Sequence, residues 1–218
     1  MNPRLFSFVG GDSGPWRIER MDLVSGAALA DATRLNINAN DAVLPGVAAW
    51  SLRGITSNER YVTHEEKQQL VAKQQGVGRA ASTCAALIPI RKSEAWWALP
   101  QDARRKILEE RSVHIKIGLE YLPAIARRLH HCRDLGTPEP FDFITWFEFA
   151  PADAPAFDRL VAALRATEEW SYVEREVDIR VMRDPDFLTT NRSQNRDSAV
   201  FSMANIRSLS VTFPLMSA

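Results

Sequence analysis

Apolar and polar positions alternate clearly in the second half of the chain. Residues 86–91 form a short apolar run that is typical of a buried strand, and residues 141–149 carry an apolar side chain or threonine at every second position. The residues expected on one face of this second strand are Phe141, Phe143, Thr145, Phe147 and Phe149. A last strand is marked by Val173, Val177, Ile179 and Val181.

Helical spacing predicts two helices among these strands. Residues 101–132 read as one helix that carries both His114 and Arg127. An unbroken helix would hold the two side chains roughly 20 Å apart on different faces, but a kink at Pro123 would let both address one site. A second, amphipathic helix covers residues 154–169. Its apolar positions are Phe157, Leu160, Val161 and Leu164.

The first half has a weaker pattern. Residues 5–9 and 16–24 predict short strands separated by a GGDSGP turn, and residues 48–55 predict a third strand. Residues 25–47 read as irregular, and residues 65–75 as a polar helix.

The order of elements predicts an α+β fold. A succession of strand, helix, strand, helix and strand favours a ferredoxin-like α/β sandwich, with an antiparallel sheet and helices packed on one side. We expect residues 1–182 to form a single unit and residues 183–218 to form a C-terminal tail outside the core.

Composition narrows the function classes. The 27 basic and 27 acidic side chains balance, which argues against a nucleic-acid partner and means that an anionic substrate needs a local cation such as Arg127. Cys84 and Cys132 are too few for a disulfide framework, so a cytoplasmic location is expected. No apolar segment reaches the length of a signal-peptide core or the roughly 20 residues of a membrane span, which predicts a soluble protein without a membrane partner.

Single residues admit two interpretations. His114 is a candidate metal ligand, although an interior histidine satisfied by protein groups is the commoner case. Arg127 and its neighbour Arg128 read equally well as solvated helix residues. Glu168 and Glu169 close a predicted helix at the end that the dipole disfavours for acids, which points weakly to another role.

Two further pairs have simpler explanations. Trp96 and Trp97 are large apolar groups for which core packing is the usual role. His130 and His131 would point about 100° apart on a helix and are therefore expected at the surface.

Four segments in one order resemble the chlorite dismutase family of haem b enzymes, over about residues 48–182. They read AALIPIRKSEAWW, SVHIKIGLEYLPAIARRLHHCRDLG, FDFITWFEFA and ATEEWSYVEREVDIR. The match is especially similar to the short-chain, dimeric branch. It implies a homodimer of the dimeric alpha-beta barrel type, with a trimmed N-terminal half (1–80) and a haem-binding half (84–182).

The resemblance also implies roles for single residues. His114 matches the ligand of the haem iron, and Glu169, or its neighbour Glu168, matches the carboxylate that binds this histidine. Arg127 matches the distal arginine, with Arg128 the less favoured alternative. The remaining residues implied to bind the cofactor are Asn58, Tyr61, Lys92, Trp96 and Trp97 in motifs near the haem propionates, Phe147 in the distal pocket, and Gln74 toward the distal side.

The implied activity is conversion of chlorite to chloride and dioxygen through O–O bond formation, an oxidoreductase reaction that could serve either detoxification or respiration. Arg127 would hold the anion by charge and several donors. Two alternatives stay open. Close relatives decarboxylate coproheme with peroxide, but they carry a tyrosine where this chain has Ile88 and a glutamine where it has Arg127. The other alternative is a non-catalytic haem-binding dimer.

Overall fold

A computed structural model describes residues 4–40, 46–56, 68, 73 and 76–185. The chain divides into two compact units, Met1–Arg183 and Asp184–Ala218, and the first contains nearly all of the described residues. Some predictions fall outside the described residues. They concern Asn58, Tyr61, Gln74, most of the 65–75 helix and almost all of the 183–218 tail.

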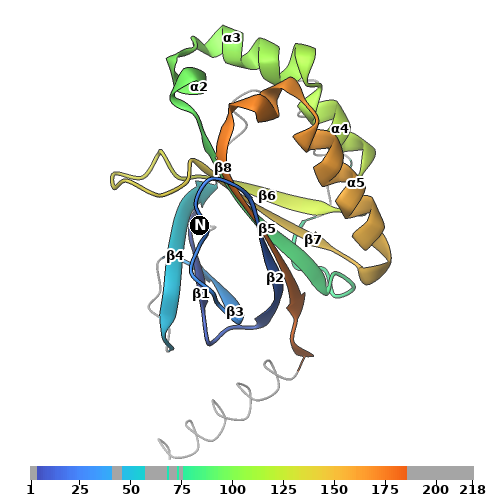
Figure 1. Cartoon of the computed structure of the whole chain (residues 1–218). Helices are drawn as coiled ribbons and strands as arrows, with labels where there is room; N and C mark the ends of the chain where they lie inside the picture. The colour runs from blue at the N-terminus through green and yellow to red at the C-terminus, as the bar shows by residue number, and fades with distance from the viewer. Residues whose placement is uncertain (1–3, 41–45, 57–67, 69–72, 74–75, 186–218) are drawn as a thin grey trace, which may run out of the picture. The chain divides into compact units, whose positions relative to one another are not determined.

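Eight antiparallel strands form a closed barrel in the order β1-β3-β2-β8-β5-β7-β6-β4 (Figure 1). In the first half of the chain the strands are β1 (Leu5–Gly11), β2 (Trp16–Ser25), β3 (Arg34–Ala39) and β4 (Ala48–Thr56). In the second half they are β5 (Cys84–Lys92), β6 (Ala126–His131), β7 (Phe143–Phe149) and β8 (Val173–Arg183). The predicted antiparallel sheet is confirmed. Its closure into a barrel was implied by the family resemblance and not by the residue pattern.

The helices and helical turns belong to the second half of the chain and lie outside the barrel, beside its strands or beyond their end (Figure 1). They are α2 (Glu94–Ala98), α3 (Gln101–Arg105), the π-helical turn η1 (Lys106–Arg111), α4 (His114–Glu120), the 3-10 turn η2 (Pro151–Asp153), α5 (Ala154–Arg165) and the 3-10 turn η3 (Glu168–Tyr172). The predicted helix at 154–169 is confirmed as α5 over Ala154–Arg165, with its four apolar positions buried. Its predicted end is wrong, because Glu168 and Glu169 begin the separate turn η3. Within the described part of the chain, no helix combines the length and apolar character needed to cross a membrane.

The two halves share one strand order. In each, the first strand lies between the fourth and the third, and the second strand lies outside the third, as in β4-β1-β3-β2 and β8-β5-β7-β6. Pairing of β2 with β8 and of β4 with β6 joins the halves. Because these joining pairs are far apart in sequence, local periodicity gave no sign of the closure.

Two cores follow from the alternation of side chains along the strands. One fills the barrel, and its largest fully buried members are Trp146, Phe8, Phe141, Leu35, Leu52, Leu87, Ile144 and Ile179. The other lies between the outer face of the sheet and the helices, and it contains Ala86, Ile88, Ile125, Phe147, Phe149 and the four apolar residues of α5. The prediction that the residues of 141–149 share one face is therefore confirmed for Phe147 and Phe149. It is wrong for Phe141, which precedes β7 and packs inside the barrel.

The prediction that residues 25–47 are irregular is wrong, because they contain β3. Its alternation is hidden by asparagines at positions 36 and 38. Leu35 is nevertheless completely buried in the barrel, and β1 supplies a continuous ladder of backbone partners along the strand. Tertiary pairing thus overrides a weak local signal.

The single helix predicted for residues 101–132 is also wrong. The chain breaks at Val113, whose φ of 45° is left-handed, restarts as α4, ends near Pro123 and returns as β6. Proline cannot continue the helix because it lacks an N–H and clashes with the preceding turn. The adjacent pairs Arg127–Arg128 and His130–His131 hid the strand, because each pair puts the same residue type on both faces.

His130 and His131 are buried, so the prediction of surface positions is wrong. On a strand, neighbours point to opposite faces. His130 packs its ring against Phe6 and Phe8 inside the barrel, and His131 packs edge-on against Phe143 outside it. Burial and the nearby Arg128 lower the pKa of His130 to about 3, so its imidazole is neutral.

Candidate functional site

His114 is the first residue of α4 and follows directly on a strained position. Val113 is β-branched, and its left-handed φ is rare for such a residue. Before it, the buried Ser112 accepts a hydrogen bond on Oγ from the backbone N–H of Glu169 at 2.9 Å. This bond ties the break in the helical segment to η3, and it brings His114 beside that turn.

Glu169 lies at the centre of a three-residue chain. His114 Nδ1 donates to Glu169 Oε2 at 2.7 Å, and Lys92 Nζ donates to Glu169 Oε1 at 2.8 Å. Glu168 instead pairs with the exposed Arg111 at 2.8 Å. The structure thus brings His114, Glu169 and Lys92 together and directs Glu168 toward solvent.

The buried charges of Glu169 and Lys92 compensate each other. Burial alone would raise the pKa of Glu169, but the charges and hydrogen bonds of His114 and Lys92 outweigh it and lower the pKa to about 2. Burial lowers the pKa of Lys92, and Glu169 opposes that shift. The ammonium group also lies over the rings of Trp96 and Trp170, at 4.7 Å and 5.5 Å from their centroids. Glu169 is therefore a fixed carboxylate acceptor for the histidine.

Arg127 stands on the outer face of β6, opposite Phe147 on β7. Its guanidinium lies against Gly118 of α4, where an added Cβ would come within 2.3 Å of Nη1. Gly118 follows His114 by one helical turn and so lies on the same side of α4. Burial lowers the pKa of Arg127 and the charge of Glu109 opposes this, yet a guanidinium keeps its proton in proteins. A permanent cation therefore lies between the sheet and the helix that begins with His114.

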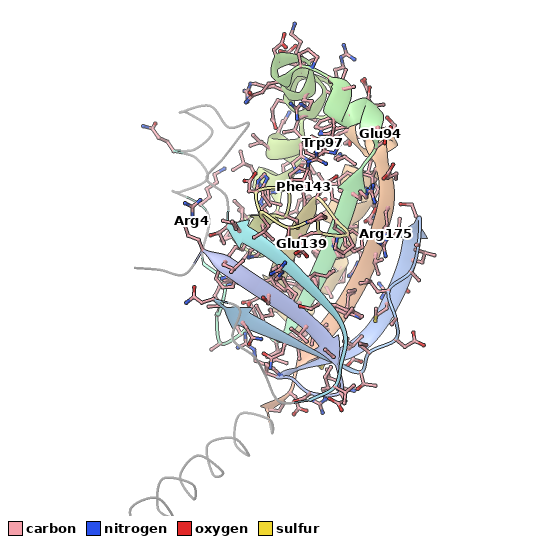
Figure 2. All side chains as sticks on the ribbon, turned by 90° about the vertical axis from the view of Figure 1, so that its left-hand side faces the viewer. Arg4, Glu94, Trp97, Glu139, Phe143 and Arg175 are labelled. Atoms are coloured by element: carbon pink, nitrogen blue, oxygen red, sulfur yellow. The ribbon has the colours of Figure 1, made fainter. Side chains whose placement is uncertain are left out.

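Trp97 belongs to α2, which follows the end of β5. Figure 2 shows it beside Phe143, with which it stacks at a centroid distance of 6.0 Å. Its indole N–H donates to Asp142 Oδ2 at 3.1 Å, and the same oxygen accepts from the backbone N–H of Lys92 at 2.7 Å. Asp142 therefore links Trp97 to Lys92, the buried last residue of β5.

The ligand set of this site is one imidazole. Because Nδ1 donates to Glu169, Nε2 is the ring atom through which His114 could bind a metal. Among the residues that the structure describes, no group of three or more histidine, cysteine, aspartate or glutamate side chains could hold a metal ion. A metal bound here must therefore bring most of its own ligands.

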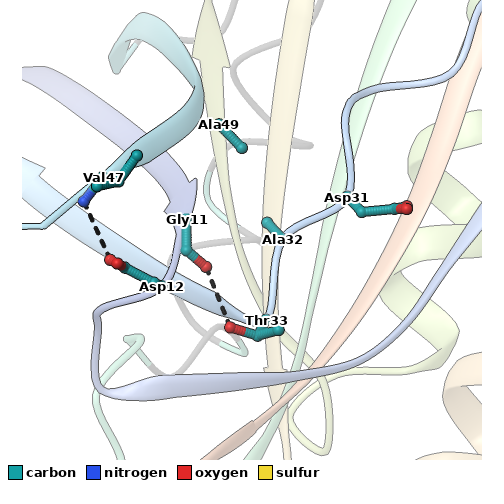
Figure 3. A pocket seen from close by; sticks show the side chains of 7 residues that line it. All are labelled: Gly11, Asp12, Asp31, Ala32, Thr33, Val47 and Ala49. Atoms are coloured by element: carbon teal, nitrogen blue, oxygen red, sulfur yellow. Dashed lines mark hydrogen bonds between the residues drawn. The ribbon is translucent and has the colours of Figure 1, made fainter.

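A shallow depression in the first half of the barrel contains none of the predicted site residues (Figure 3). It is lined by Gly11, Asp12, Asp31, Ala32, Thr33, Val47 and Ala49. Asp12 Oδ1 accepts from the backbone N–H of Val47 at 3.1 Å, and Thr33 Oγ1 donates to the Gly11 carbonyl at 3.3 Å. These polar groups hold the loops together, which is a sufficient role for them.

Three residues at the site were not predicted from the sequence. Ser112 and Asp142 act through hydrogen bonds to distant segments, and Gly118 provides room for Arg127. No local pattern marks such partners, because these hydrogen bonds join residues 45 or more positions apart, and the contact of Gly118 depends on the path of β6. The spacing of Gly118 four residues after His114 was the one available signal.

Replacement of Glu169 should destabilise the protein far more than replacement of its neighbour. Glu169→Gln keeps the shape but leaves the buried Lys92 ammonium without an anion, which should cost about 1.5–3 kcal/mol of unfolding free energy. Glu168→Gln removes only an exposed pair and should leave stability nearly unchanged. Urea unfolding of both variants measures the difference, and equal values would show that the Lys92–Glu169 pair contributes little.

Comparison with known proteins identifies the family. A family model described as chlorite dismutase matches residues 31–184, well over half of the chain. A chlorite dismutase from Ideonella dechloratans is 32% identical over 124 residues, which are 56% of this chain and 41% of that protein. The chain therefore spans about two fifths of the length of this curated relative.

Solved structures agree with this assignment. The dimeric chlorite dismutase from Nitrobacter winogradskyi is 55% identical, with a TM-score of 0.75 over 82% of this chain and 99% of that chain. The chlorite dismutase from Candidatus Nitrospira defluvii in complex with imidazole is 20% identical, with a TM-score of 0.63 over 87% of this chain and 96% of that one, and so shows the shared fold. The chain belongs to the chlorite dismutase family.

Proposed function

We propose that this protein is a haem b-dependent chlorite dismutase, which converts chlorite to chloride and dioxygen. The observation that carries the proposal is the hydrogen bond from His114 Nδ1 to the buried Glu169, with Arg127 against the same helix one turn later. An imidazole fixed in this tautomer presents Nε2 to a metal, and a permanent cation nearby suits an anionic substrate. Family membership supplies the reaction.

The residues present fit a haem. A porphyrin brings four nitrogen ligands, so a single histidine suffices where no larger ligand group exists among the described residues. The indole N–H of Trp96 is buried without a hydrogen-bond acceptor in the described part of the chain, which suits a residue implied to lie near the propionates. Leu129 shares the outer face of β6 with Arg127 and is 41% exposed, an apolar surface that a flat group would cover.

Each residue has a proposed task. Bound haem supplies the redox chemistry that breaks Cl–O bonds and forms the O–O bond. His114 would hold the iron, and Glu169 would keep the proton on Nδ1 and make the imidazole a stronger donor. Arg127 would bind the chlorite anion and retain the hypochlorite fragment, and Phe147 beside it would help to exclude water.

Other expectations remain part of this proposal. Lys92 would act through Glu169, with which it pairs, while Trp97, Tyr61 and Asn58 would serve the propionates and Gln74 the distal side. Each half of the barrel would be a ferredoxin-like unit, which the order of its four strands supports.

We further propose that the protein is a homodimer that works in the cytoplasm. The dimeric state of the Nitrobacter winogradskyi relative supports the first point. The two cysteines, Cys84 and Cys132, are free thiols, which supports a reducing compartment.

Oxygen release tests the function directly. Purified, haem-loaded protein should evolve dioxygen on addition of chlorite, measured with an oxygen electrode alongside the Soret spectrum. Haem binding without oxygen would reject the dismutase activity, and a coproheme-plus-peroxide assay would then test decarboxylation. Ile88, buried where decarboxylating relatives carry a tyrosine, argues against that outcome.

A further inference from the structure

We infer that Arg79, on the segment before β5, positions Arg127 by fixing the turn from which β6 starts. The inference rests on the proposed function, in which Arg127 handles the substrate anion. Arg79 is half-buried. It is neither part of the hydrogen-bonded group of His114, Glu169 and Lys92 nor one of the residues implied by the resemblance. Its role would therefore be exerted through Arg127.

One guanidinium group binds three backbone carbonyls. Arg79 Nη1 donates to the Pro123 carbonyl at 2.8 Å, while Nη2 donates to the Ala124 carbonyl at 2.7 Å and to the Glu148 carbonyl at 3.2 Å. The first two acceptors lie in the turn between α4 and β6, and the third lies on β7. Arg79 thus joins the start of β6 to its neighbour β7, and we call these three hydrogen bonds the Arg79 clamp.

These carbonyls need such a donor because of their place in the chain. Helix α4 ends at Glu120 and β6 begins at Ala126, so Pro123 and Ala124 belong to neither a helix nor a sheet ladder. Unpaired backbone carbonyls in a partly buried turn are costly. A planar guanidinium with a fixed fork of donors holds two of them in one geometry.

Arg79 itself is anchored on the same pair of strands. The backbone N–H of Gly78 donates to Glu148 Oε2 at 2.5 Å, and Glu148 Oε1 accepts from the indole of Trp146 at 2.9 Å. The Glu148 side chain is buried, and its residue pairs with Ala126 across the ladder. The segment carrying Arg79 is therefore fixed to β7 at the register position directly beside Arg127.

The consequence for Arg127 is geometric. Its guanidinium lies in a narrow space against Gly118, so a small shift of β6 would move it away from α4 or press it into the helix. Electrostatic catalysis depends on donors that are already in place, and a displacement of about 1 Å can cost as much as about 100-fold in rate. Loss of the Arg79 clamp should therefore reduce what Arg127 contributes.

The test compares Arg79→Ala with Arg127→Ala and the double variant, all loaded with haem. Arg79→Ala should lower kcat/KM for chlorite by on the order of tenfold and raise hypochlorite release, with an unchanged Soret spectrum. The double variant should match Arg127→Ala, because the clamp has nothing left to position. Additive losses in the double variant would overturn the inference.

Arg175→Ala is the matched control. Arg175, labelled in Figure 2, also binds two successive carbonyls, with Nε donating to Ala27 at 2.8 Å and Nη2 to Ala28 at 3.2 Å, but in the loop between β2 and β3. It should lower thermal stability without changing kcat/KM or hypochlorite release. An equal loss of activity in Arg175→Ala would mean that any loosened loop has the same effect, and would overturn the role of Arg79.

Two further measurements make the outcome decisive. Arg79→Lys keeps the charge but lacks the planar fork, so it should resemble Arg79→Ala, and full activity in it would refute the clamp. Titration of the ferric proteins with cyanide reads the distal cation without chlorite turnover. If wild-type protein makes no oxygen, the proposed function fails. A weaker cyanide affinity shared by Arg79→Ala and Arg127→Ala would still support the inference, and an unchanged affinity in Arg79→Ala would reject it.

Discussion

His114→Ala should abolish oxygen release from chlorite and weaken haem binding by more than about 100-fold. Loss of a residue that only orients a metal ligand typically costs about 10- to 100-fold in affinity, so loss of the ligand itself should cost more. Nε2 of His114 is the atom we assign to the iron, and its ring is fixed through Glu169 at 2.7 Å. Haem titration followed by the Soret band measures the affinity.

The control for this variant lies on the same helix. Lys116→Ala changes an exposed residue of α4 and should leave both haem affinity and oxygen release unchanged. Added imidazole should partly restore the ferric spectrum of His114→Ala, because a free ligand can enter the space that the side chain leaves. A His114→Ala protein that binds haem as tightly as the wild type would remove this residue as the ligand.

Strong local periodicity made much of the second half predictable. The apolar run of β5, the alternation in β7 and the amphipathic spacing of α5 are each set by neighbours along the chain, and all three elements were expected. Closure of the barrel was implied by the family resemblance alone and not by periodicity, because it depends on pairing of β2 with β8 and of β4 with β6. Such pairing reflects the backbone partners that each strand finds, and no pattern within a single strand encodes it.

The candidate site was likewise predictable from the sequence only in part. His114, Glu169 and Arg127 were singled out from motifs, but a helix that included Arg127 gave the wrong geometry. Once Pro123 ends the helical segment, Arg127 returns on a strand beside α4. The position of Lys92 behind Glu169 could not be read from the sequence either, since 77 residues separate them and a buried lysine has no local signature.

Arg127→Ala should keep haem bound but lower kcat/KM for chlorite by about 100- to 1000-fold, the usual cost of removing one preorganised donor to a developing anion. It should also release more hypochlorite, trapped with a chlorinatable dye, because the fragment loses its cation before the O–O bond forms. Arg127→Lys keeps a point charge without the fork of donors, so its kcat/KM and hypochlorite release should fall between those of the wild type and Arg127→Ala. The measurements are initial rates of oxygen release and dye chlorination per chlorite consumed.

Arg128→Ala is the decisive comparison, because the two arginines are adjacent in sequence but face opposite sides of β6. Arg128 lies over the ring of Phe6 inside the barrel, and its Nε donates to His130 Nε2 at 3.2 Å. Its loss leaves a buried acceptor unsatisfied and should cost about 1–3 kcal/mol of stability. It should not change hypochlorite release. If Arg128→Ala instead releases more hypochlorite than Arg127→Ala, the cation that retains the anion is reached through the barrel, and the outer face of β6 is not the distal side.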